Sequence, residues 1–372
     1  MSADKTVILS INASWNILNF RLGLVRGLQQ AGYQVVALAP EDAYTQQLAD
    51  HGIGYLPIAM EPRGTSILAD IALFWRYWRT LRRVRPAAFL GYTIKPNIYG
   101  SLAAHLVGVP TINNIAGLGE TFLDRRPVNR LVRFLYRVAL SRARVIFFQN
   151  PDDRALFVDN GIADAARSRL LPGSGIDLSR FTPPSAPRDE AKGISFLLVA
   201  RLLEAKGIAD YAAAARIVRR QYPSARFRLL GILQSGKGAL ARETIAGWEA
   251  DGTIEFLGSS DDVRPFLAES DCVVLPTYYP EGTPRSLLEA AAMGRPLIAS
   301  DVPGCREIVR DGDNGFQVPP RDPETLAATM LRFIAMSPAE RAVMGARSRE
   351  IAEREYDEQI VVRRYLEALD AG

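Results

Sequence analysis

The chain has 372 residues, 48% of them hydrophobic and 23% charged, and its formal net charge is +4. This length exceeds the size at which a single hydrophobic core usually stops growing, so we expect two domains. The longest apolar runs are far too short to span a bilayer and no signal-type segment follows Met1, so we expect a cytoplasmic protein.

Short apolar runs alternate with amphipathic segments along the first half of the chain. The runs that predict strands are residues 6–11, 33–40, 87–93, 110–116, 144–150 and 169–176. The segments that predict helices are residues 20–31, 97–108 and 127–142. Strands and helices in alternation are typical of a parallel sheet covered by helices, so we predict an α/β first domain at residues 1–180.

A polar, proline-rich segment at residues 181–193 predicts a linker. A second alternating set follows it, with predicted strands at residues 194–200, 225–232, 253–258, 272–277, 295–300 and 315–320. We therefore predict a second doubly wound domain at residues 194–350 and a C-terminal helix at 351–372 that can pack back toward the first domain. A central cleft between two such domains is the natural ligand site.

Charge is divided unevenly along the chain. Residues 1–180 hold 21 Lys and Arg against 13 Asp and Glu, a net of +8, and the remainder holds 24 against 28, a net of −4. In the basic half, Trp75, Tyr77 and Trp78 stand among arginines in one predicted helix, and residues 126–144 repeat the mixture. Such helices suit an anionic membrane surface, so we expect peripheral association with the inner face of the cell membrane. The alternative is a solvated helix face whose aromatics lie in the core; no nucleic-acid-binding module is recognised, so nucleic acid is not expected as a partner.

Polar residues gather after the predicted strands of the second domain. Arg201 and Lys206 follow its first strand, Gly231 follows the next, and Glu281 and Glu289 follow the fourth. Ligands of parallel α/β sheets bind beyond the carboxyl ends of the strands. We therefore expect two cations, a glycine turn that admits a ligand and two carboxylates at one ligand-binding edge.

The helix that carries Glu289 has a predicted anion-binding start. Thr283 and Pro284 are predicted to be its N-cap and first residue. The next three backbone amides would then point out of the helix N-terminus, where N–H groups and the helix dipole attract an anion. These amides belong to Arg285, Ser286 and Leu287.

Glu289 lies among leucines and alanines, and an unpaired carboxylate is costly to bury. Its partners are expected to be hydroxyl groups of a ligand, a backbone turn or Arg201. A ligand with a diphosphate, a ribose diol and a polyol would satisfy the whole edge, and a nucleotide sugar has this composition. Structural ion pairs and other phosphate ligands remain open on spacing alone.

Two stretches of the second domain, residues 200–208 and 281–322, together with the seven residues between Glu281 and Glu289, resemble retaining glycosyltransferases of family 4. In the first domain, residues 91–123 and 145–154 are similar to a branch that builds bacterial surface polysaccharides on lipid carriers. The resemblance implies the GT-B fold, in which two Rossmann-like domains face a central cleft.

The resemblance also implies roles for the residues at this edge. Arg201 and Lys206 would hold the donor diphosphate, Glu281 would bind hydroxyls of the donor sugar, and Glu289 would bind the ribose hydroxyls. The remaining donor contacts would come from Gly231 and Gly258 near the base and from the turn residues Gly282, Thr283, Pro284, Arg285, Ser286 and Leu287. No metal or cofactor is expected besides the nucleotide-sugar co-substrate, and the leaving phosphate itself would accept the acceptor proton.

The first domain departs from the pattern of many family members. Its first loop, which contains Asn16, has no glycine, and no histidine follows its fourth strand. The remaining candidates for acceptor or cleft contacts are Gly117, Gly119, Glu120, Lys95 and Asn150. For Glu120 the alternative is a surface acid at a helix start.

We therefore expect a retaining enzyme that moves a hexose or N-acetylhexosamine, with UDP as the expected carrier, to a polyprenyl-diphosphate-linked saccharide. Two alternatives stay open. One is a nucleotide-sugar epimerase of the same fold, which should carry several acids and histidines in its first domain. The other is a non-catalytic nucleotide-sugar-binding protein that recruits partners to the membrane.

Overall fold

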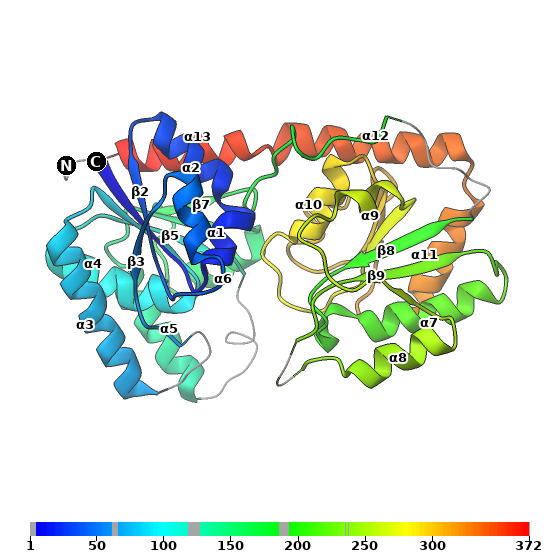
Figure 1. The fold of residues 1–372 in the computed structure, drawn as a ribbon, viewed down its shortest axis with the longest axis horizontal. Coiled ribbons are helices and arrows are strands. Elements are labelled where there is room, and N and C mark those ends of the chain that lie inside the picture. Colours follow the sequence, from blue (N-terminus) through cyan, green and yellow to red (C-terminus); the bar gives the residue numbers. More distant parts are fainter. Residues whose placement is uncertain are drawn as a thin grey trace. The chain divides into compact units, whose positions relative to one another are not determined.

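Figure 1 shows a computed structural model of the chain, which describes residues 5–61, 66–117, 127–185, 193–234, 236 and 238–371. The chain divides into two compact units, Met1–Gly175 with Glu358–Gly372, and Ile176–Asp357. Each unit contains one parallel sheet with helices on both faces, so the predicted pair of doubly wound α/β domains is confirmed.

The sheet of the first unit has the strand order β3-β2-β1-β4-β5-β6-β7. Its strands are β1 (Thr6–Ser10), β2 (Gln34–Ala39), β3 (Gly54–Pro57), β4 (Ala88–Tyr92), β5 (Thr111–Ile115), β6 (Val145–Phe148) and β7 (Ser168–Leu170). Its helices are α1 (Ser14–Phe20), α2 (Leu22–Gln30), the 3-10 helix η2 (Thr45–His51), α3 (Ile67–Val84), the π-helix η3 (Pro96–Gly100), α4 (Ser101–Val107), α5 (Pro127–Leu140), α6 (Pro151–Asp159) and α13 (Glu358–Asp370).

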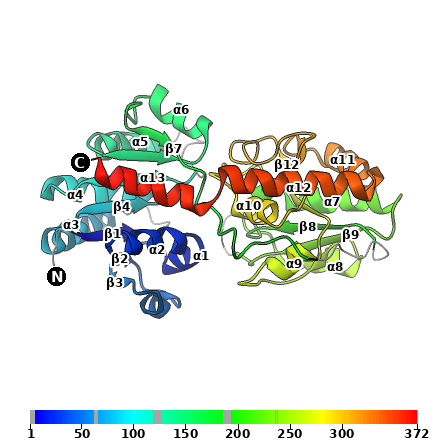
Figure 2. The ribbon, with the colours of Figure 1, turned by 90° about the horizontal axis from the view of Figure 1, so that it is seen from above.

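The two faces of this sheet are covered by different helices. One hydrophobic core joins the sheet to α1, α2 and α13, and Figure 2 shows α13 lying across the strands. Two further cores join the opposite face to α3, α4, α5 and α6. The strands β1 and β4 at the centre of the sheet are buried along their whole length, which explains why their sequences are mostly apolar runs.

The sheet of the second unit has the order β10-β9-β8-β11-β12-β13. Its strands are β8 (Ser195–Val199), β9 (Arg226–Leu230), β10 (Glu255–Phe256), β11 (Cys272–Leu275), β12 (Leu297–Ser300) and β13 (Gly315–Val318). Its helices are the 3-10 helix η6 (Glu204–Lys206), α7 (Ile208–Arg219), α8 (Arg242–Ala250), α9 (Arg264–Ala268), α10 (Arg285–Ala292), α11 (Pro323–Ala335) and α12 (Pro338–Glu355). Helices α7, α8 and α11 cover one face, and α9, α10 and α12 cover the other.

The units divide earlier than the predicted linker at 181–193. Ile176 and Phe181 are 0% and 3% exposed and pack in the core of the second unit beside α10 and α12, so the chain enters this unit at Ile176. The predicted C-terminal helix 351–372 is two helices: α12 ends at Glu355 within the second unit, and α13 packs on α2 of the first. The local sequence does not reveal either division between the units, at Ile176 or at Glu358. Each division depends on which of the two hydrophobic cores the neighbouring apolar side chains pack in.

Some elements differ from the sequence-based prediction. The helix expected at 20–31 is preceded by α1, whose first amide donates to Asp42 at 2.7 Å, a cap supplied by the loop after β2. The elements η2, β3 and α6 were not predicted, and α6 has little amphipathic pattern. None of the helices in the described part of the chain combines the length and the apolar composition needed to cross a membrane.

Candidate functional site

The strand order of the second unit reverses between β8 and β11. At such a reversal the loops that follow the two strands leave in opposite directions. A binding crevice forms between these loops, beyond the carboxyl ends of the strands. Here the two loops are tied together, because the Tyr278 amide and the Thr277 hydroxyl both donate to the carbonyl of Ala205, at 2.9 and 3.1 Å. This edge carries Lys206 and Glu281, as predicted from their spacing.

Lys206 and Glu281 form an ion pair between the two loops. The Lys206 ammonium group donates to Oε1 of Glu281, which also accepts from the Thr277 hydroxyl at 3.3 Å. The two side chains are 9% and 12% exposed, so the pair is shielded from solvent. Gly207 allows this approach: its φ is +70°, and a Cβ there would lie 1.9 Å from the carbonyl oxygen of Pro276.

Arg201 lies on the loop after β8 and is exposed. Its guanidinium lies 5.9 Å from the ring centroid of Tyr279, and the Lys206 ammonium lies 5.1 Å from the same ring. Among the residues that the structure describes, no carboxylate pairs with Arg201. The positive charge of Lys206 is therefore compensated by Glu281, while that of Arg201 is not. Tyr279 was not among the residues predicted from the sequence, although it stands two positions before Glu281 in the same loop.

Glu289 has a cationic partner one turn earlier on α10. The Arg285 Nε donates to its Oε1 at 3.0 Å, and the two side chains are 20% and 14% exposed. Burial raises the pKa of the Glu289 carboxyl, while Arg285 and, more weakly, Arg180 oppose that rise. Within the part of the chain that the structure describes, the partner of Glu289 is Arg285, and neither a backbone turn nor Arg201 takes that place.

The helix α10 begins one residue later than predicted. Pro284 is the N-cap, with φ −62° and an extended ψ of 117°, and Arg285 is the first helical residue. The proline ring fixes φ but leaves ψ open, so proline can stand just outside the helix as well as inside it. Of the three amides expected to point outward, that of Leu287 donates to the Pro284 carbonyl at 3.2 Å instead.

Glycines pack the surrounding loops closely. Gly304, with φ +89°, lies so near Gly282 that a Cβ would come within 1.9 Å of the Gly282 carbonyl oxygen, which places the loop after β12 beneath the turn before α10. Gly231 donates its amide to the Gly258 carbonyl at 2.8 Å. A Cβ on Gly231 would lie 1.8 Å from the Ala200 carbonyl oxygen, so the residue that follows β8 already requires glycine there. The predicted close approach of a ligand is not needed to explain this glycine.

The first unit has its own reversal, between β1 and β4, and two candidates follow these strands. Asn16 donates to the Asn12 side chain at 3.0 Å, and Lys95 pairs with Asp70 at 2.7 Å. Asn150 is 1% exposed and caps α6, accepting from the amide of Asp153 at 2.7 Å, which is a structural role.

The remaining first-unit candidates lie at the margin of the described residues. Gly117 has a φ of +100°, as a tight turn requires. Gly119 and Glu120 lie outside the residues that the structure describes.

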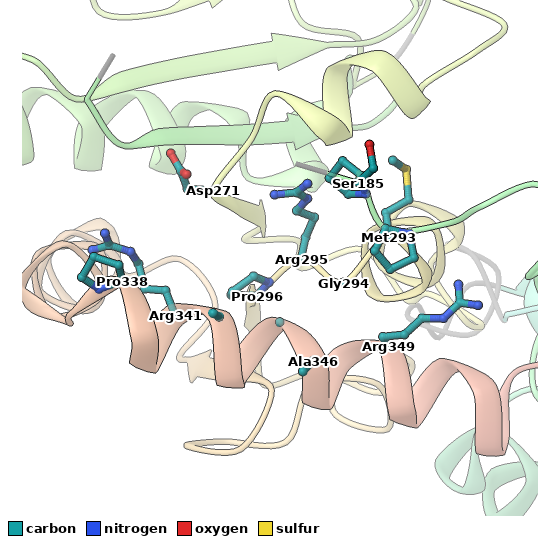
Figure 3. A pocket seen from close by; sticks show the side chains of 14 residues that line it. Ser185, Asp271, Met293, Gly294, Arg295, Pro296, Pro338, Arg341, Ala346 and Arg349 are labelled. Atoms are coloured by element: carbon teal, nitrogen blue, oxygen red, sulfur yellow. The ribbon is translucent and has the colours of Figure 1, made fainter. Parts of the chain in front are cut away.

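A hollow of about 530 Å³ lies elsewhere in the second unit, at the amino ends of β11 and β12. Figure 3 shows Arg341 and Arg349 of α12 on one side of it and Arg295 and Met293 on the other. Arg349 donates to the carbonyls of Phe181 and Ala292 at 2.6 and 2.7 Å, so it holds the ends of two chain segments together. None of the predicted site residues lines this hollow.

Two Rossmann-like units, one with paired charges at its reversal point, define the chain as a protein of the GT-B fold. Residues 193–336 match the family described as "Glycosyl transferases group 1", and residues 19–174 match the "Glycosyl transferase 4-like domain". These two matches together span most of the chain, one in each half. The chain is therefore a glycosyltransferase of this family, and the family resemblance seen in the sequence is confirmed.

Two named relatives are similar to the chain over most of its length. The N,N'-diacetylbacillosaminyl-diphospho-undecaprenol alpha-1,3-N-acetylgalactosaminyltransferase of Campylobacter jejuni is 25% identical over 96% of both chains. The UDP-Gal:alpha-D-GlcNAc-diphosphoundecaprenol alpha-1,3-galactosyltransferase of Escherichia coli is 22% identical over 83% of this chain and 85% of its own.

Solved structures show the same fold. HepE of Anabaena, crystallised in complex with UDP, is 18% identical and superposes with a TM-score of 0.81 over 99% of this chain and 100% of its own. Sucrose-phosphate synthase of Thermosynechococcus elongatus is also 18% identical, with a TM-score of 0.79 over 98% of both chains. The predicted GT-B fold is thereby confirmed.

Proposed function

We propose that this glycosyltransferase moves a hexose or N-acetylhexosamine, with retention of configuration, from a UDP-sugar to a saccharide carried on a polyprenyl diphosphate. The observation that carries the proposal is the charged edge at the reversal point of the second unit, where Lys206 and Glu281 join two loops beside Arg201. The names of the two relatives support the acceptor, since both act on sugars linked to undecaprenyl diphosphate. HepE, crystallised with UDP, supports the donor nucleotide.

In this proposal the cations stabilise the departing UDP. Breaking the bond to the anomeric carbon places negative charge on the diphosphate. A cation at about 4 Å, at an effective dielectric near 20, offers up to about 4 kcal/mol before desolvation. Arg201 offers a positive charge that no carboxylate among the described residues compensates, while Lys206 becomes available as Glu281 turns to the hydroxyls of the donor sugar.

The carboxylates bind hydroxyl groups. Glu289 accepts from the ribose diol and Glu281 from the sugar, and each such bond to an ionised oxygen is stronger than a neutral one. The leaving phosphate takes the proton of the acceptor hydroxyl on the same face of the sugar, so no side-chain nucleophile is required. Metal independence remains a prediction.

The acceptor's lipid carrier makes a membrane surface the natural partner of the first unit. Helices α3 and α5 lie on the same face of its sheet (Figure 1). Both helices expose apolar side chains. On α3 the exposed fractions are 67% for Ile67, 80% for Leu68 and 53% for Trp75. On α5 the exposed apolar residues are Leu131, Phe134 and Val138.

The aromatics of α3 do not all face outward. Tyr77 is fully buried, with its hydroxyl 2.9 Å from that of Ser10, and Trp78 packs beneath the Arg82 guanidinium at 5.0 Å. Both were expected to belong to the interfacial mixture, so Trp75 is the aromatic of the three that α3 leaves exposed. The apolar stripe is thus made mainly by aliphatic residues, with exposed arginines further along the helix.

Neither alternative is favoured by a specific observation. The curated relatives named above are transferases, and the residues proposed to hold the donor are all present.

Calorimetry with UDP and with a complete donor tests the donor assignment. We first identify the donor by thermal shift with a panel of UDP-sugars, because a bound ligand raises apparent stability by mass action. Glu289→Gln should weaken UDP binding by about 1–3 kcal/mol, the scale of a lost charge-assisted hydrogen bond. Glu281→Gln should bind UDP normally and the complete donor poorly. If Glu289→Gln binds UDP as the parent does but melts well below it, Glu289 is a structural ion-pair partner and the ribose assignment is wrong.

A further inference from the structure

Arg285 faces Glu289 across one turn of α10, and its side chain has no role in the proposed reaction so far. Its Nε donates to Oε1 of Glu289 at 3.0 Å. The contact is mostly shielded, since the two side chains are 20% and 14% exposed, and shielding strengthens an ion pair relative to one on the surface. The second oxygen, Oε2 of Glu289, has no hydrogen-bond partner among the residues that the structure describes.

Three charged groups from three segments act on Glu289. Arg285 belongs to its own helix, Arg180 to the segment that enters the second unit, and Asp262 to the loop after β10. Asp262 is itself held by Arg264, whose Nε and Nη2 each donate to it at 2.7 Å. Arg285 is thus the cation in direct contact with the carboxylate, and the one that most opposes the effect of burial on its pKa.

We propose that Arg285 is a positioning residue for donor binding, which orients the Glu289 carboxylate and keeps it charged so that Oε2 accepts from the ribose diol. This inference rests on the proposed function, in which Glu289 binds the ribose. A carboxylate with one oxygen already held loses less rotamer freedom when the ligand binds, so the site is preorganised. Arg285 acts through Glu289 and makes no contact with the phosphates.

The test compares UDP with dideoxy-UDP, the analogue that lacks both ribose hydroxyls, by calorimetry. The parent should bind UDP more tightly than dideoxy-UDP. Arg285→Ala should lose about tenfold in UDP affinity, because its Glu289 carboxylate is no longer held in the orientation that meets the ribose, and nothing in dideoxy-UDP affinity. Arg285→Lys keeps the charge and should lose less. Unchanged dideoxy-UDP binding shows that the variant site is folded.

The ratio of the UDP affinity to the dideoxy-UDP affinity should also depend on pH. Both nucleotides carry the same diphosphate, so the effect of phosphate titration cancels in this ratio. Burial raises the pKa of the Glu289 carboxyl, and the Ala variant lacks the cation that opposes this rise, so its carboxyl takes up a proton at a higher pH. The preference of Arg285→Ala for UDP should therefore shrink as the pH falls from about 8 to 5.5, while the parent keeps more of its preference. Glu289→Gln should show no such change.

The outcomes separate this inference from the function on which it rests. Equal binding of the two nucleotides by the parent contradicts the ribose assignment itself. A parental preference for UDP that survives in Arg285→Ala contradicts the positioning role alone. An equal loss for both nucleotides in Arg285→Ala means that Arg285 meets the phosphates or supports the fold, and this also overturns the inference.

Discussion

Lys206 and Glu281 are 75 positions apart in the chain, and their ion pair joins the loops that follow the two central strands of the second sheet. Arg201 lies on the first of these loops without a carboxylate partner among the described residues. Because a buried pair that loses one partner leaves an uncompensated charge, the two cations should respond differently to substitution.

Arg201→Ala should weaken UDP binding and lower turnover. Lys206→Ala should lower turnover by about 10²–10³, as for the loss of other preorganised charge stabilisers. It should also reduce stability, because the shielded Glu281 carboxylate loses the Lys206 cation. Steady-state kinetics with the identified donor, together with thermal unfolding, measures both effects. Arg216→Ala is the control, since its pair with Asp251 is half exposed at 50% and 46% and it should keep parental turnover. Parental turnover in either site variant would remove that residue from the mechanism.

The sequence predicted the charged residues of this site but not all of their partners. Strand ends and spacing were enough to place Lys206 and Glu281 at one edge, since both follow central strands. The spacing of Arg285 and Glu289, four residues apart on a predicted helix, is typical of an ion pair. The sequence equally allowed ligand hydroxyls as the partners of the Glu289 carboxylate, so the spacing alone did not identify Arg285. The sequence made Asn150 a candidate for a ligand contact because it did not predict α6. The N-cap role of Asn150 cannot be identified without the helix that it caps.

At the scale of the loops, glycines bring the donor edge together. Three glycines approach the backbone of a neighbouring segment very closely. A Cβ atom added to any of them would lie within 2 Å of a backbone carbonyl oxygen; they are Gly207, Gly231 and Gly304. An added methyl group cannot be relieved by rotating a side chain, because the neighbour in each case is backbone.

Gly207→Ala should therefore destabilise the second unit by about 1–3 kcal/mol and move the Lys206 loop away from Glu281. Gly247→Ala is the matched control, because Gly247 lies in α8 with nothing within 4 Å of the added Cβ, and the change should stabilise that helix by about 0.5–1 kcal/mol. Denaturant unfolding measures the two free energies. Equal and small effects would mean that the loop adapts at no cost.

The exposed stripe of α3 is a second element whose role can be measured. Replacing Arg79, Arg82 and Arg83 together should abolish binding to anionic vesicles while UDP binding survives, and binding by the parent should weaken as salt rises. Vesicle co-sedimentation at several salt concentrations gives this result. Binding that does not depend on salt, or no binding by the parent, would leave the stripe as an ordinary solvated helix face.

At the scale of the molecule, two parallel sheets and their alternating helices were predictable, because fully buried strands appear as apolar runs. The division of the chain was not, because Ile176 and Phe181 reveal their unit only by the core in which they pack. The same holds for α13, whose apolar face completes the core of the first unit from the far end of the sequence. The family match is consistent with this division, since each of its two parts falls in one half of the chain.

Transfer of a single sugar to a lipid-linked acceptor tests the central claim most directly. Vesicles containing an N-acetylhexosamine on undecaprenyl diphosphate are incubated with the enzyme and the UDP-sugar identified by thermal shift. The lipid is then extracted, and its molecular mass is measured by mass spectrometry. The proposed function predicts a gain of one sugar residue with the parent enzyme and a strongly reduced gain with Arg201→Ala. An unchanged lipid under conditions where the donor binds, or an equal gain with Arg201→Ala, would contradict it.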